Sequence, residues 1–384
     1  MTTADFLIIG GGVAGLSAAA RLVRHGRVVV LEGEGAIGYH SSGRSVSFSH
    51  YGIGNLAVRG MTAWSRDFFE RPPEGFSPTP LARPVASLYF AAEEERPALA
   101  ALQAEMARFT DRIEEVGAEA MTALCPALRT GEDAAVIGLL DPTGLKLDAD
   151  ALLQGFARAV RAGGGEVVTG RRIAAIEPNG QGWSVRTESG ESWSAPVLID
   201  AAGAWADRIA AFAGVAPIGL QPKRRTIIVV DPPADTDISS WPFAHSAAGD
   251  FYMLPEAGQL LVSPVDEVED DPCDAAPEEY DVALAADRLE HYTTVPVTRI
   301  AHRWAGLRSF VADRTPTAGF DPEAPGFFWL VGQGGYGLQT APAMSAAVEA
   351  LVTDSQWPDG LAELGVLPEH IRPERLRSSQ GGAT

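Results

Sequence analysis

Cysteine and long apolar runs are scarce in this chain of 384 residues. Its two cysteines, Cys125 and Cys273, stand far apart and lack the spacing of metal ligands, so we expect neither a disulfide framework nor a metal site. No apolar run is long enough to span a bilayer, so no transmembrane segment is expected. The first such run, residues 6–9, leads directly into glycines and is typical of a strand rather than of a signal peptide. These features favour a protein of the reducing cytoplasm.

Positively charged residues are also few. Lys and Arg number 30 against 50 Asp and Glu, which gives a net charge of −20. Such a surface repels nucleic acids and anionic membranes, so we expect neither as a partner. An anionic small molecule stays compatible with this balance, because a local pocket can be basic on an acidic protein. Hydrophobic residues make up 46% of the chain, which is enough for two cores rather than one.

The first 32 residues predict a strand, a helix and a second strand. Residues 6–9 are a short apolar run, and residues 16–25 carry apolar side chains at helical spacing. Residues 28–31 form a second apolar run that ends at Glu32. A strand, a glycine turn, a helix and a parallel strand within so few residues are typical of a βαβ unit.

Glycines of this unit follow the G-x-G-x-x-G pattern of dinucleotide-binding proteins. Gly10 permits a tight turn, Gly12 lets the backbone approach a pyrophosphate, and Gly15 lets the helix pack close to the sheet. Glu32 stands where a carboxylate accepts hydrogen bonds from ribose hydroxyls and repels the 2′-phosphate of NADP. The pattern therefore predicts dinucleotide binding, with a turn needed only for packing as the alternative.

A second glycine-rich turn near the C-terminus favours FAD over NAD. Residues 327–331 predict a strand, residues 332–337 a glycine-rich turn, and residues 338–352 a helix. Such a turn can aim a helix N-terminus at the flavin pyrimidine edge, where negative charge develops on reduction. An ordinary helix cap is the alternative interpretation.

The α/β pattern occurs in three separate stretches, with β-rich sequence between them. It appears at the start, near residues 145–210 and near residues 327–352. This arrangement predicts an α/β (α+β) fold in which two domains interleave along the chain. We assign residues 1–82, 145–216 and 311–384 to a Rossmann-like FAD-binding domain, and residues 83–144 and 217–310 to a β-rich substrate-binding domain.

Several motifs occur in an order that resembles the D-amino-acid oxidase superfamily of flavoproteins. They follow the opening glycine motif and read Gly38–Ser45, Asp200–Trp205, Gln221–Arg225, Trp304–Phe310 and Gln333–Thr340. The set is most similar to the bacterial FAD-dependent D-arginine dehydrogenase branch, and the resemblance covers residues 5 to about 376.

The resemblance implies noncovalently held FAD. His40 is an alternative covalent anchor, since some relatives use a histidine. The residues expected along the cofactor are Gly10, Gly12, Val13, Ala14, Gly15, Glu32, Ser42, Arg44, Ser45, Ile173, Ala202, Gly203, Trp205, Gly335, Tyr336, Gly337, Leu338, Gln339 and Thr340.

The resemblance also implies a substrate held over the flavin by its α-carboxylate. Arg225, Arg308 and Tyr252 match the residues that hold this group in the family. An arginine offers a rigid two-pronged donor for a carboxylate, and a tyrosine adds a hydroxyl donor. A structural ion pair or a solvated basic face is the alternative role for the arginines.

The expected side-chain pocket departs from the D-arginine branch. The glutamate that grips a guanidinium falls on Ser87, the histidine near the substrate amine falls on Phe48, and a tyrosine of a lid-like loop falls on Ile53. Because the anion that would offset burial of a cation is missing, we expect neutral, largely apolar side chains. The remaining expected pocket residues are His50, Phe243, His245 and Gly335.

The resemblance implies oxidative deamination of a D-amino acid by hydride transfer from Cα to flavin N5. The products are a 2-oxo acid and ammonia, and the acceptor that reoxidises the flavin is quinone-like or O2. No side chain stands out as a general base. Oxidation of glycine, a secondary amino acid or a 2-hydroxy acid is an alternative, as is a noncatalytic FAD-binding subunit.

Overall fold

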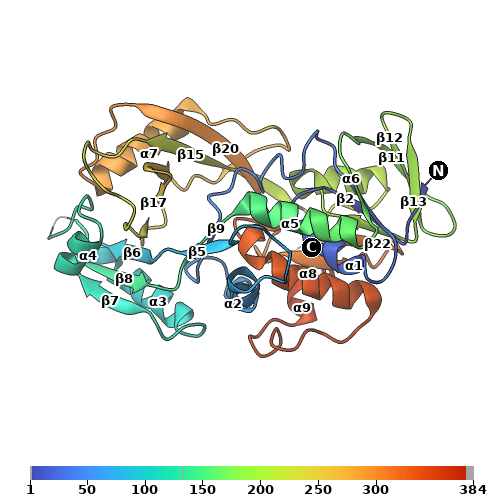
Figure 1. The fold of residues 1–384 in the computed structure, drawn as a ribbon, viewed down its shortest axis with the longest axis horizontal. Helices are drawn as coiled ribbons and strands as arrows, with labels where there is room; N and C mark the ends of the chain where they lie inside the picture. The colour runs from blue at the N-terminus through green and yellow to red at the C-terminus, as the bar shows by residue number, and fades with distance from the viewer. Residues whose placement is uncertain (1, 133, 378–384) are drawn as a thin grey trace, which may run out of the picture.

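A six-stranded sheet forms the centre of one half of the molecule. The computed structural model describes residues 2–132 and 134–377. Strands follow the order β10-β3-β2-β14-β22-β21 and are parallel except for the edge strand β21 (Figure 1). Their bounds are β10 Glu166–Val168, β3 Val28–Leu31, β2 Phe6–Ile9, β14 Val197–Asp200, β22 Phe327–Val331 and β21 Thr317–Phe320.

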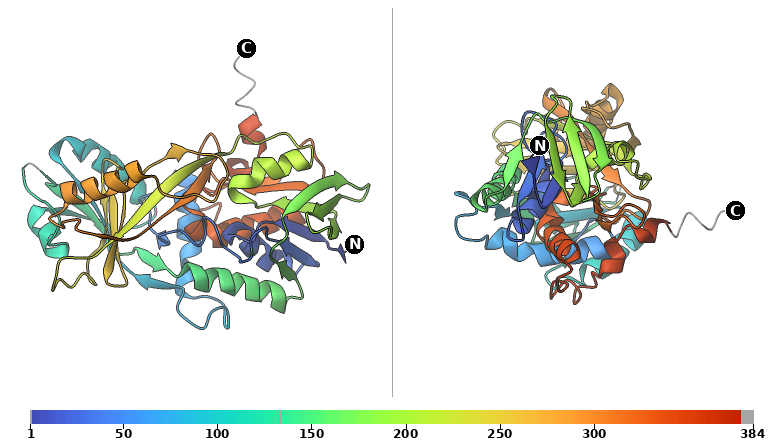
Figure 2. Two further views of the ribbon diagram at one scale, coloured as in Figure 1. Left: turned by 90° about the horizontal axis from the view of Figure 1, so that it is seen from above. Right: turned by 90° about the vertical axis from the view of Figure 1, so that its right-hand side faces the viewer.

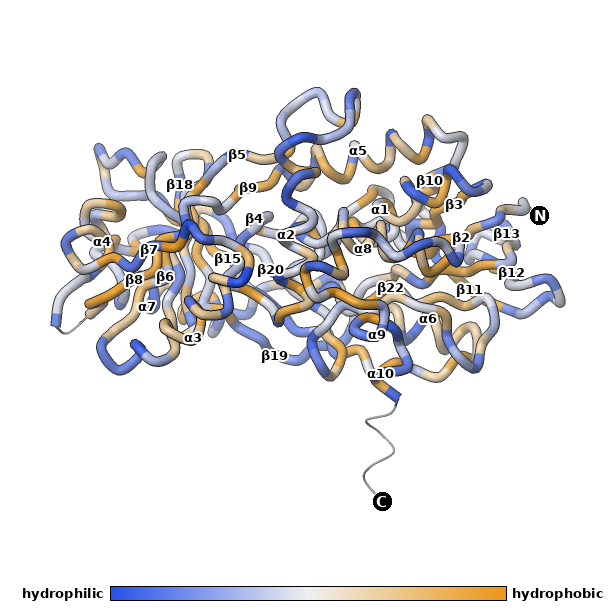
Figure 3. The backbone as a smooth tube through the Cα atoms, turned by 90° about the horizontal axis from the view of Figure 1, so that it is seen from below, coloured by the Kyte–Doolittle hydropathy of each residue, from blue (hydrophilic) through white to orange (hydrophobic). Residues whose placement is uncertain are grey.

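Both faces of this sheet are covered, which explains why its strands are apolar throughout. Ile8 and Val30 belong to the core on the helical side, whereas Leu7 and Val29 belong to the core on the opposite side. Successive side chains of a strand point to opposite faces, so a strand covered on both faces needs apolar residues at every position. Figure 3 shows hydrophobic residues gathered along the inner elements and hydrophilic residues mostly in the outer turns.

Four helices cover one face. They are α1 Val13–Leu22, α2 Leu56–Glu70, α5 Ala149–Ala162 and α8 Gly337–Thr353. Helix α1 packs between α5 and α8, and α2 packs on the other side of α8. The start of α5 is fixed by Asp148, whose Oδ1 accepts a hydrogen bond of 2.9 Å from the backbone N–H of Ala151.

A small meander and a short helix cover the opposite face. The meander pairs with the first strand of the chain, and α6 packs beside it. The bounds are β1 Thr2–Thr3, β11 Ile173–Pro178, β12 Trp183–Thr187, β13 Ser192–Ala195, η2 Gly203–Trp205 and α6 Ala206–Phe212.

A nine-stranded sheet forms the other half of the molecule (Figure 1). It draws its strands from two separate stretches of the chain, residues 87–141 and 221–310. Its strands are β6 Ser87–Ala91, β7 Glu114–Gly117, β8 Ile137–Asp141, β15 Gln221–Val230, β16 Phe243–Ser246, β17 Tyr252–Glu256, β18 Gln259–Ser263, β19 Val268–Glu269 and β20 Ile300–Phe310. Helices of this half are η1 Glu93–Glu95, α3 Arg96–Met106, α4 Ala118–Leu124 and α7 Glu279–Tyr292.

Two features connect the halves. The antiparallel pair of long strands β15 and β20 runs from the nine-stranded sheet toward the centre of the molecule (Figure 2). A three-stranded sheet of β4 Phe48–Ser49, β9 Leu145–Leu147 and β5 Ala82–Pro84 lies at the same junction. The chain therefore passes repeatedly between the halves, and we keep the two-domain boundaries as an interpretation of this layout.

The last described elements are α9 Pro368–Ile371 and α10 Glu374–Arg377. None of the helices in the described part of the chain is both long enough and apolar enough to cross a membrane.

Candidate active site

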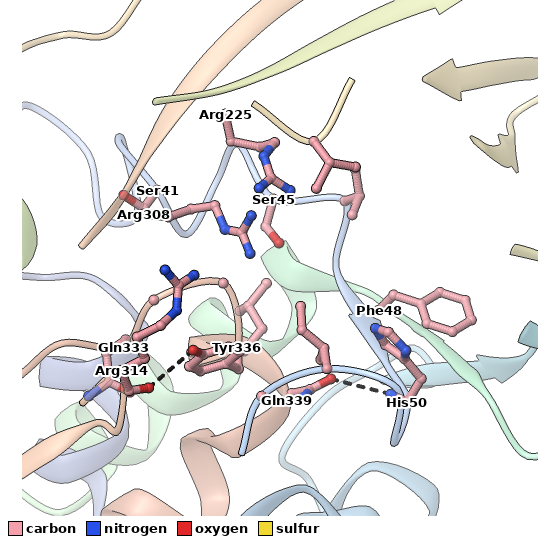
Figure 4. A pocket seen from close by; sticks show the side chains of 18 of the residues that line it. Ser41, Ser45, Phe48, His50, Arg225, Arg308, Arg314, Gln333, Tyr336 and Gln339 are labelled. Atoms are coloured by element: carbon pink, nitrogen blue, oxygen red, sulfur yellow. Dashed lines mark hydrogen bonds between the residues drawn. The ribbon is translucent and has the colours of Figure 1, made fainter. Parts of the chain in front are cut away.

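A cavity of about 850 Å³ lies where the two halves meet. Its lining combines the first glycine turn, the second glycine turn and the facing strands of the nine-stranded sheet. Figure 4 shows arginines on one side of this space and aromatic rings on another.

Helix α1 begins at the cavity without a capping side chain. Its N-cap residue is Gly12, and the backbone N–H of Val13 donates to Ser42 Oγ at 3.0 Å. Gly10 has a φ of 111°, and a Cβ there would collide with the carbonyl oxygen of Ala201. A Cβ on Gly15 would collide with the carbonyl of Gly10, so the helix reaches the sheet this closely only because both are glycines.

Glu32 is fixed beside this turn. One carboxylate oxygen accepts a hydrogen bond of 2.7 Å from the N–H of Gly11, and the other accepts one of 2.8 Å from the N–H of Glu34. The side chain does not line the cavity itself. Its two backbone contacts place the carboxylate next to the first glycine turn, where it would accept hydrogen bonds from the ribose hydroxyls of a dinucleotide.

Helix α8 also begins at the cavity without a side-chain cap, and Gly337 and Leu338 line the space. Uncapped N-termini present free N–H groups and partial positive charge, which suit a pyrophosphate at α1 and the flavin pyrimidine edge at α8. Gly335 lies against the guanidinium of Arg308, and a Cβ there would collide with it. These two glycine-lined cradles fit FAD.

Arg225, Arg308 and Tyr252 come together on the cavity wall from three different strands. Arg225 Nε donates to the carbonyl oxygen of Asp266 at 2.8 Å. Arg225 Nη2 and Arg308 Nη1 are buried, and neither has a hydrogen-bond partner among the described residues. Burial, and then the charge of Arg225, lower the pKa of Arg308 to about 9. Two adjacent arginines with spare donors form a receptor for an anion.

The sequence did not point to two charged residues beside this pair. Glu267 forms a two-pronged ion pair with Arg314, with contacts of 3.0 Å and 2.8 Å. Both residues line the cavity and both stand on loops, where no periodic pattern marks their side chains. An ion pair between positions so far apart in the chain has no local signal.

Aromatic rings form the opposite wall. Phe243 lies at the centre, 4.5 Å from Phe48, 4.0 Å from His245 and 5.2 Å from Tyr252 between ring centroids. These residues and Ile53 line the cavity. The wall offers apolar contact over most of its surface.

Two histidines in this wall are neutral. His50 Nδ1 lies 2.5 Å from the hydroxyl of Tyr89, and the backbone N–H of His50 donates to Gln339 Oε1 at 3.3 Å (Figure 4). Burial, and then the charge of Arg59, lower the pKa of His50 to about 3. Burial, and then His50, lower the pKa of His245 well below its usual value.

Tyr89 is a wall residue that the sequence did not predict. Burial, followed by the charge of Asp141, raises the pKa of its hydroxyl far above the usual value. The hydroxyl therefore stays protonated and can donate to the His50 ring.

Ser87 is fully buried on β6 and does not line the cavity. In the parallel pairing of β6 with β16 it lies beside Phe243, so the phenylalanine rather than the serine forms the wall. The pairing of Ser87 with Asp141 on β8 also places a carboxylate-bearing residue next to it.

Other predicted residues lie close to the cavity without lining it. Trp205 packs against His40, with ring centroids 4.5 Å apart, and Ile173 packs against the core under the meander. His40 does not line the main cavity and has its ring nitrogen 3.3 Å from Glu34. The full set of predicted cofactor residues outside the lining is Gly10, Gly15, Glu32, Ile173, Ala202, Trp205 and Thr340.

Among curated proteins, L-2-hydroxyglutarate dehydrogenase from Salmonella houtenae is 26% identical over 233 residues, which cover 56% of this chain and 50% of that protein. FAD-dependent oxidoreductase domain-containing protein 1 from Xenopus laevis is 25% identical over 183 residues, which cover 43% and 36%. The alignments thus span half or less of the length of these relatives.

Solved structures share the fold over nearly the whole chain. L-proline dehydrogenase from P. horikoshii superposes with a TM-score of 0.83 at 19% identity, covering 98% of this chain and 99% of that one. Glycine oxidase from Geobacillus kaustophilus gives a TM-score of 0.80 at 20% identity, covering 93% and 96%.

A family model described as FAD dependent oxidoreductase (DAO) matches residues 5–351. With the glycine cradles and the fold, this match settles the cofactor and the class: the chain belongs to the DAO family of FAD-dependent oxidoreductases.

Proposed function

We propose that this protein oxidises D-amino acids with neutral, largely apolar side chains to 2-oxo acids and ammonia. The observation that carries the proposal is the pairing of Arg225 and Arg308, which have spare donors, with an aromatic wall across the same cavity. One side suits a carboxylate and the other suits an uncharged side chain. The D configuration rests on the resemblance to the D-arginine dehydrogenase branch.

The arginines and Tyr252 orient the substrate. Arg225 and Arg308 bind the α-carboxylate, and the Tyr252 hydroxyl adds a donor from β17. The FAD supplies the hydride acceptor at N5 for the hydrogen that leaves Cα. By fixing the carboxylate at one end and the side chain at the other, the protein holds Cα in one orientation.

The wall argues against a cationic side chain. The aromatic wall around Phe48 and Phe243 presents no carboxylate to a guanidinium, and His50 stays neutral. Three described acidic residues line the cavity, and each already has an arginine partner. Glu267 is paired with Arg314, Glu105 with Arg59 and Asp313 with Arg375. A buried cation would therefore lose its hydration without gaining a partner.

Neither His50 nor Tyr89 is suited to act as a strong base. His50 has a pKa of about 3 and shares its Nδ1 with Tyr89. Tyr89 stays protonated because burial raises its pKa. The substrate amine accordingly loses its proton to solvent before the C–H bond breaks.

A second candidate is oxidation of a 2-hydroxy acid, favoured by the name of the relative from Salmonella houtenae. The same arginines would bind its carboxylate. A cytoplasmic location and a quinone-like acceptor or O2 are further proposals from the sequence.

The test is anaerobic reduction of the bound flavin by matched substrates. D-leucine, D-methionine and D-phenylalanine are expected to bleach the flavin faster than D-arginine, and faster than their L forms or the corresponding 2-hydroxy acids. Faster reduction by D-arginine would contradict the neutral-side-chain proposal. Faster reduction by 2-hydroxy acids would favour the second candidate.

A further inference from the structure

Glu267 stands among three arginines at the carboxylate side of the cavity. Its carboxylate lies 2.8 Å from Arg314, 3.5 Å from Arg225 and 3.9 Å from Arg308. Only the contact with Arg314 is two-pronged, with both guanidinium nitrogens engaged. Glu267 therefore satisfies the Arg314 fork and leaves Arg225 Nη2 and Arg308 Nη1 without hydrogen bonds among the described residues.

The Glu267–Arg314 pair is held by two strained turns. Val265 has a φ of 54° and Arg314 a φ of 60°, a left-handed conformation that is unfavourable for both and especially for a β-branched residue. Such strain persists only where surrounding contacts determine the conformation. Here the carbonyl of Arg314 accepts a hydrogen bond of 3.1 Å from the Tyr336 hydroxyl, and its guanidinium lies 3.9 Å from the Phe310 ring centroid.

The next residues anchor the Arg314 turn further. Arg375 Nε donates to Asp313 Oδ2 at 2.8 Å, and Asn55 Nδ2 donates to Thr315 Oγ1 at 2.7 Å. On the other turn, Asp266 accepts hydrogen bonds from the backbone and hydroxyl of Thr226 at 2.7 Å and 3.0 Å. Both turns are thus fixed so that the two ends of the ion pair meet beside the Arg225–Arg308 receptor.

The charge of Glu267 limits how many carboxylates of a ligand the three arginines can bind. Without Glu267, three guanidiniums would face the cavity with two separate places for a carboxylate. With Glu267, one of these places is already filled by a carboxylate of the protein. The open place is the one formed by Arg225 and Arg308.

We propose that Glu267 is a specificity-determining residue that occupies a second carboxylate position at Arg314, so that the site accepts substrates with one carboxylate and gives no advantage to dicarboxylates. This inference rests on the proposed carboxylate-binding role of Arg225 and Arg308. It also separates this chain from the activity named for its relative from Salmonella houtenae, whose named substrate is a dicarboxylate.

Binding of two five-carbon anions tests the proposal without turnover. Valerate carries one carboxylate and glutarate two, and each is titrated into the oxidised holoprotein while the flavin absorption spectrum is recorded. The wild-type protein is expected to bind glutarate no more tightly than valerate. A wild-type preference for glutarate of about tenfold or more, the value of a charged hydrogen-bond pair, would overturn the proposal without any variant.

The Glu267→Gln variant opens the second position. Its affinity for glutarate relative to valerate is expected to rise about tenfold or more, because the freed Arg314 fork binds the second carboxylate. The double variant Glu267→Gln/Arg314→Gln is expected to return to the wild-type ratio. The matched control Glu93→Gln removes the carboxylate from an exposed ion pair with Arg96, at 2.8 Å, and should leave the ratio unchanged.

Other results would overturn either the role of Glu267 or the carboxylate site itself. An unchanged glutarate-to-valerate ratio in Glu267→Gln, or a raised ratio that persists in the double variant, overturns the role of Glu267. If D-amino acids still reduce the flavin in that case, the proposed function stands and only this inference fails. If neither anion perturbs the flavin in any variant, the carboxylate site itself is wrong.

Discussion

At the scale of single residues, the arginine on β20 carries the most testable role. Replacing Arg308 with Met keeps an unbranched, largely apolar stem and removes the guanidinium and its charge. The value of kcat/KM for D-leucine should fall about 10- to 100-fold, as expected for the loss of a hydrogen-bonded charge of about 1.5–3 kcal/mol. FAD content, measured from the absorbance ratio of flavin to protein, should stay near the wild-type value.

The matched control lies on the same strand. Arg303 is an exposed arginine that pairs with Glu279 at 2.8 Å, and Arg303→Met should retain full activity. A variant of Arg308 that loses its flavin and its fold would instead show that the residue is structural.

Residue positions were predictable where a motif supplied them, whereas the roles of these residues stay predictions. Arg225, Arg308 and Tyr252 stand in strands whose motifs resemble a known family, and all three line the cavity. Glu267 lies in a loop, and its contact with Arg314 depends on two distant turns meeting. The resemblance predicts Ser87 on the wall, and the structure differs because β16 lies alongside β6 and brings Phe243 to that place, which the sequence does not show.

At the scale of elements, the opening βαβ unit was predicted closely. The strands have the expected bounds, whereas the first helix runs over Val13–Leu22 instead of residues 16–25. It begins earlier because Gly12 serves as the N-cap residue, and the first N–H group, that of Val13, donates to Ser42 Oγ instead of requiring a capping side chain on the N-cap residue.

The close contact of this helix with the sheet predicts the effect of Gly15→Ala. The added Cβ would collide with the carbonyl of Gly10, and moving the helix would displace the turn that receives the pyrophosphate. Bound FAD per chain should fall severalfold, and the free energy of unfolding by about 1–3 kcal/mol. Flavin absorbance measures the bound FAD, and urea unfolding measures the free energy of unfolding.

Gly117→Ala is the control for that substitution. A Cβ on Gly117, the N-cap residue of α4, would meet nothing within 4 Å, so FAD content should be unchanged even if the cap of α4 is weakened. Wild-type FAD content in Gly15→Ala would contradict the role given to this glycine.

At the scale of the whole molecule, the sequence predicted interleaving but not how the second sheet is assembled. The three stretches with α/β pattern supply five of the six strands of the sheet, and the edge strand β21 precedes the last stretch. The parallel pairing of β6 with β16 joins segments about 150 residues apart, and β20 pairs with β15 although four strands stand between them in the chain. Such pairings depend on the packing of the whole chain. The periodic spacing of apolar residues shows only which side chains of a segment are buried, and not which strands pair.

The buried histidine at the junction of the halves makes stability depend on pH. His50 has a pKa of about 3 in the folded protein against 6.5 in the unfolded chain. Between these values the unfolded chain binds a proton that the folded protein does not, so acid favours unfolding. The free energy of unfolding should fall by about 1.4 kcal/mol per pH unit from this residue as the pH decreases below about 6.5.

His50→Gln removes this contribution while keeping an acceptor for the Tyr89 hydroxyl. Burial raises the pKa of Asp200, which has the opposite effect on stability over part of the same range, so the raw slope of the wild-type protein is not diagnostic. The contribution of Asp200 cancels when the pH dependence of the wild-type protein is compared with that of His50→Gln. Urea unfolding of both holoproteins between pH 5 and pH 6.5 should show a shallower dependence in the variant by about 1.4 kcal/mol per pH unit. The exposed His302, replaced by Gln, should leave the slope unchanged, and equal slopes for His50→Gln and wild type would mean that His50 titrates normally in the folded protein.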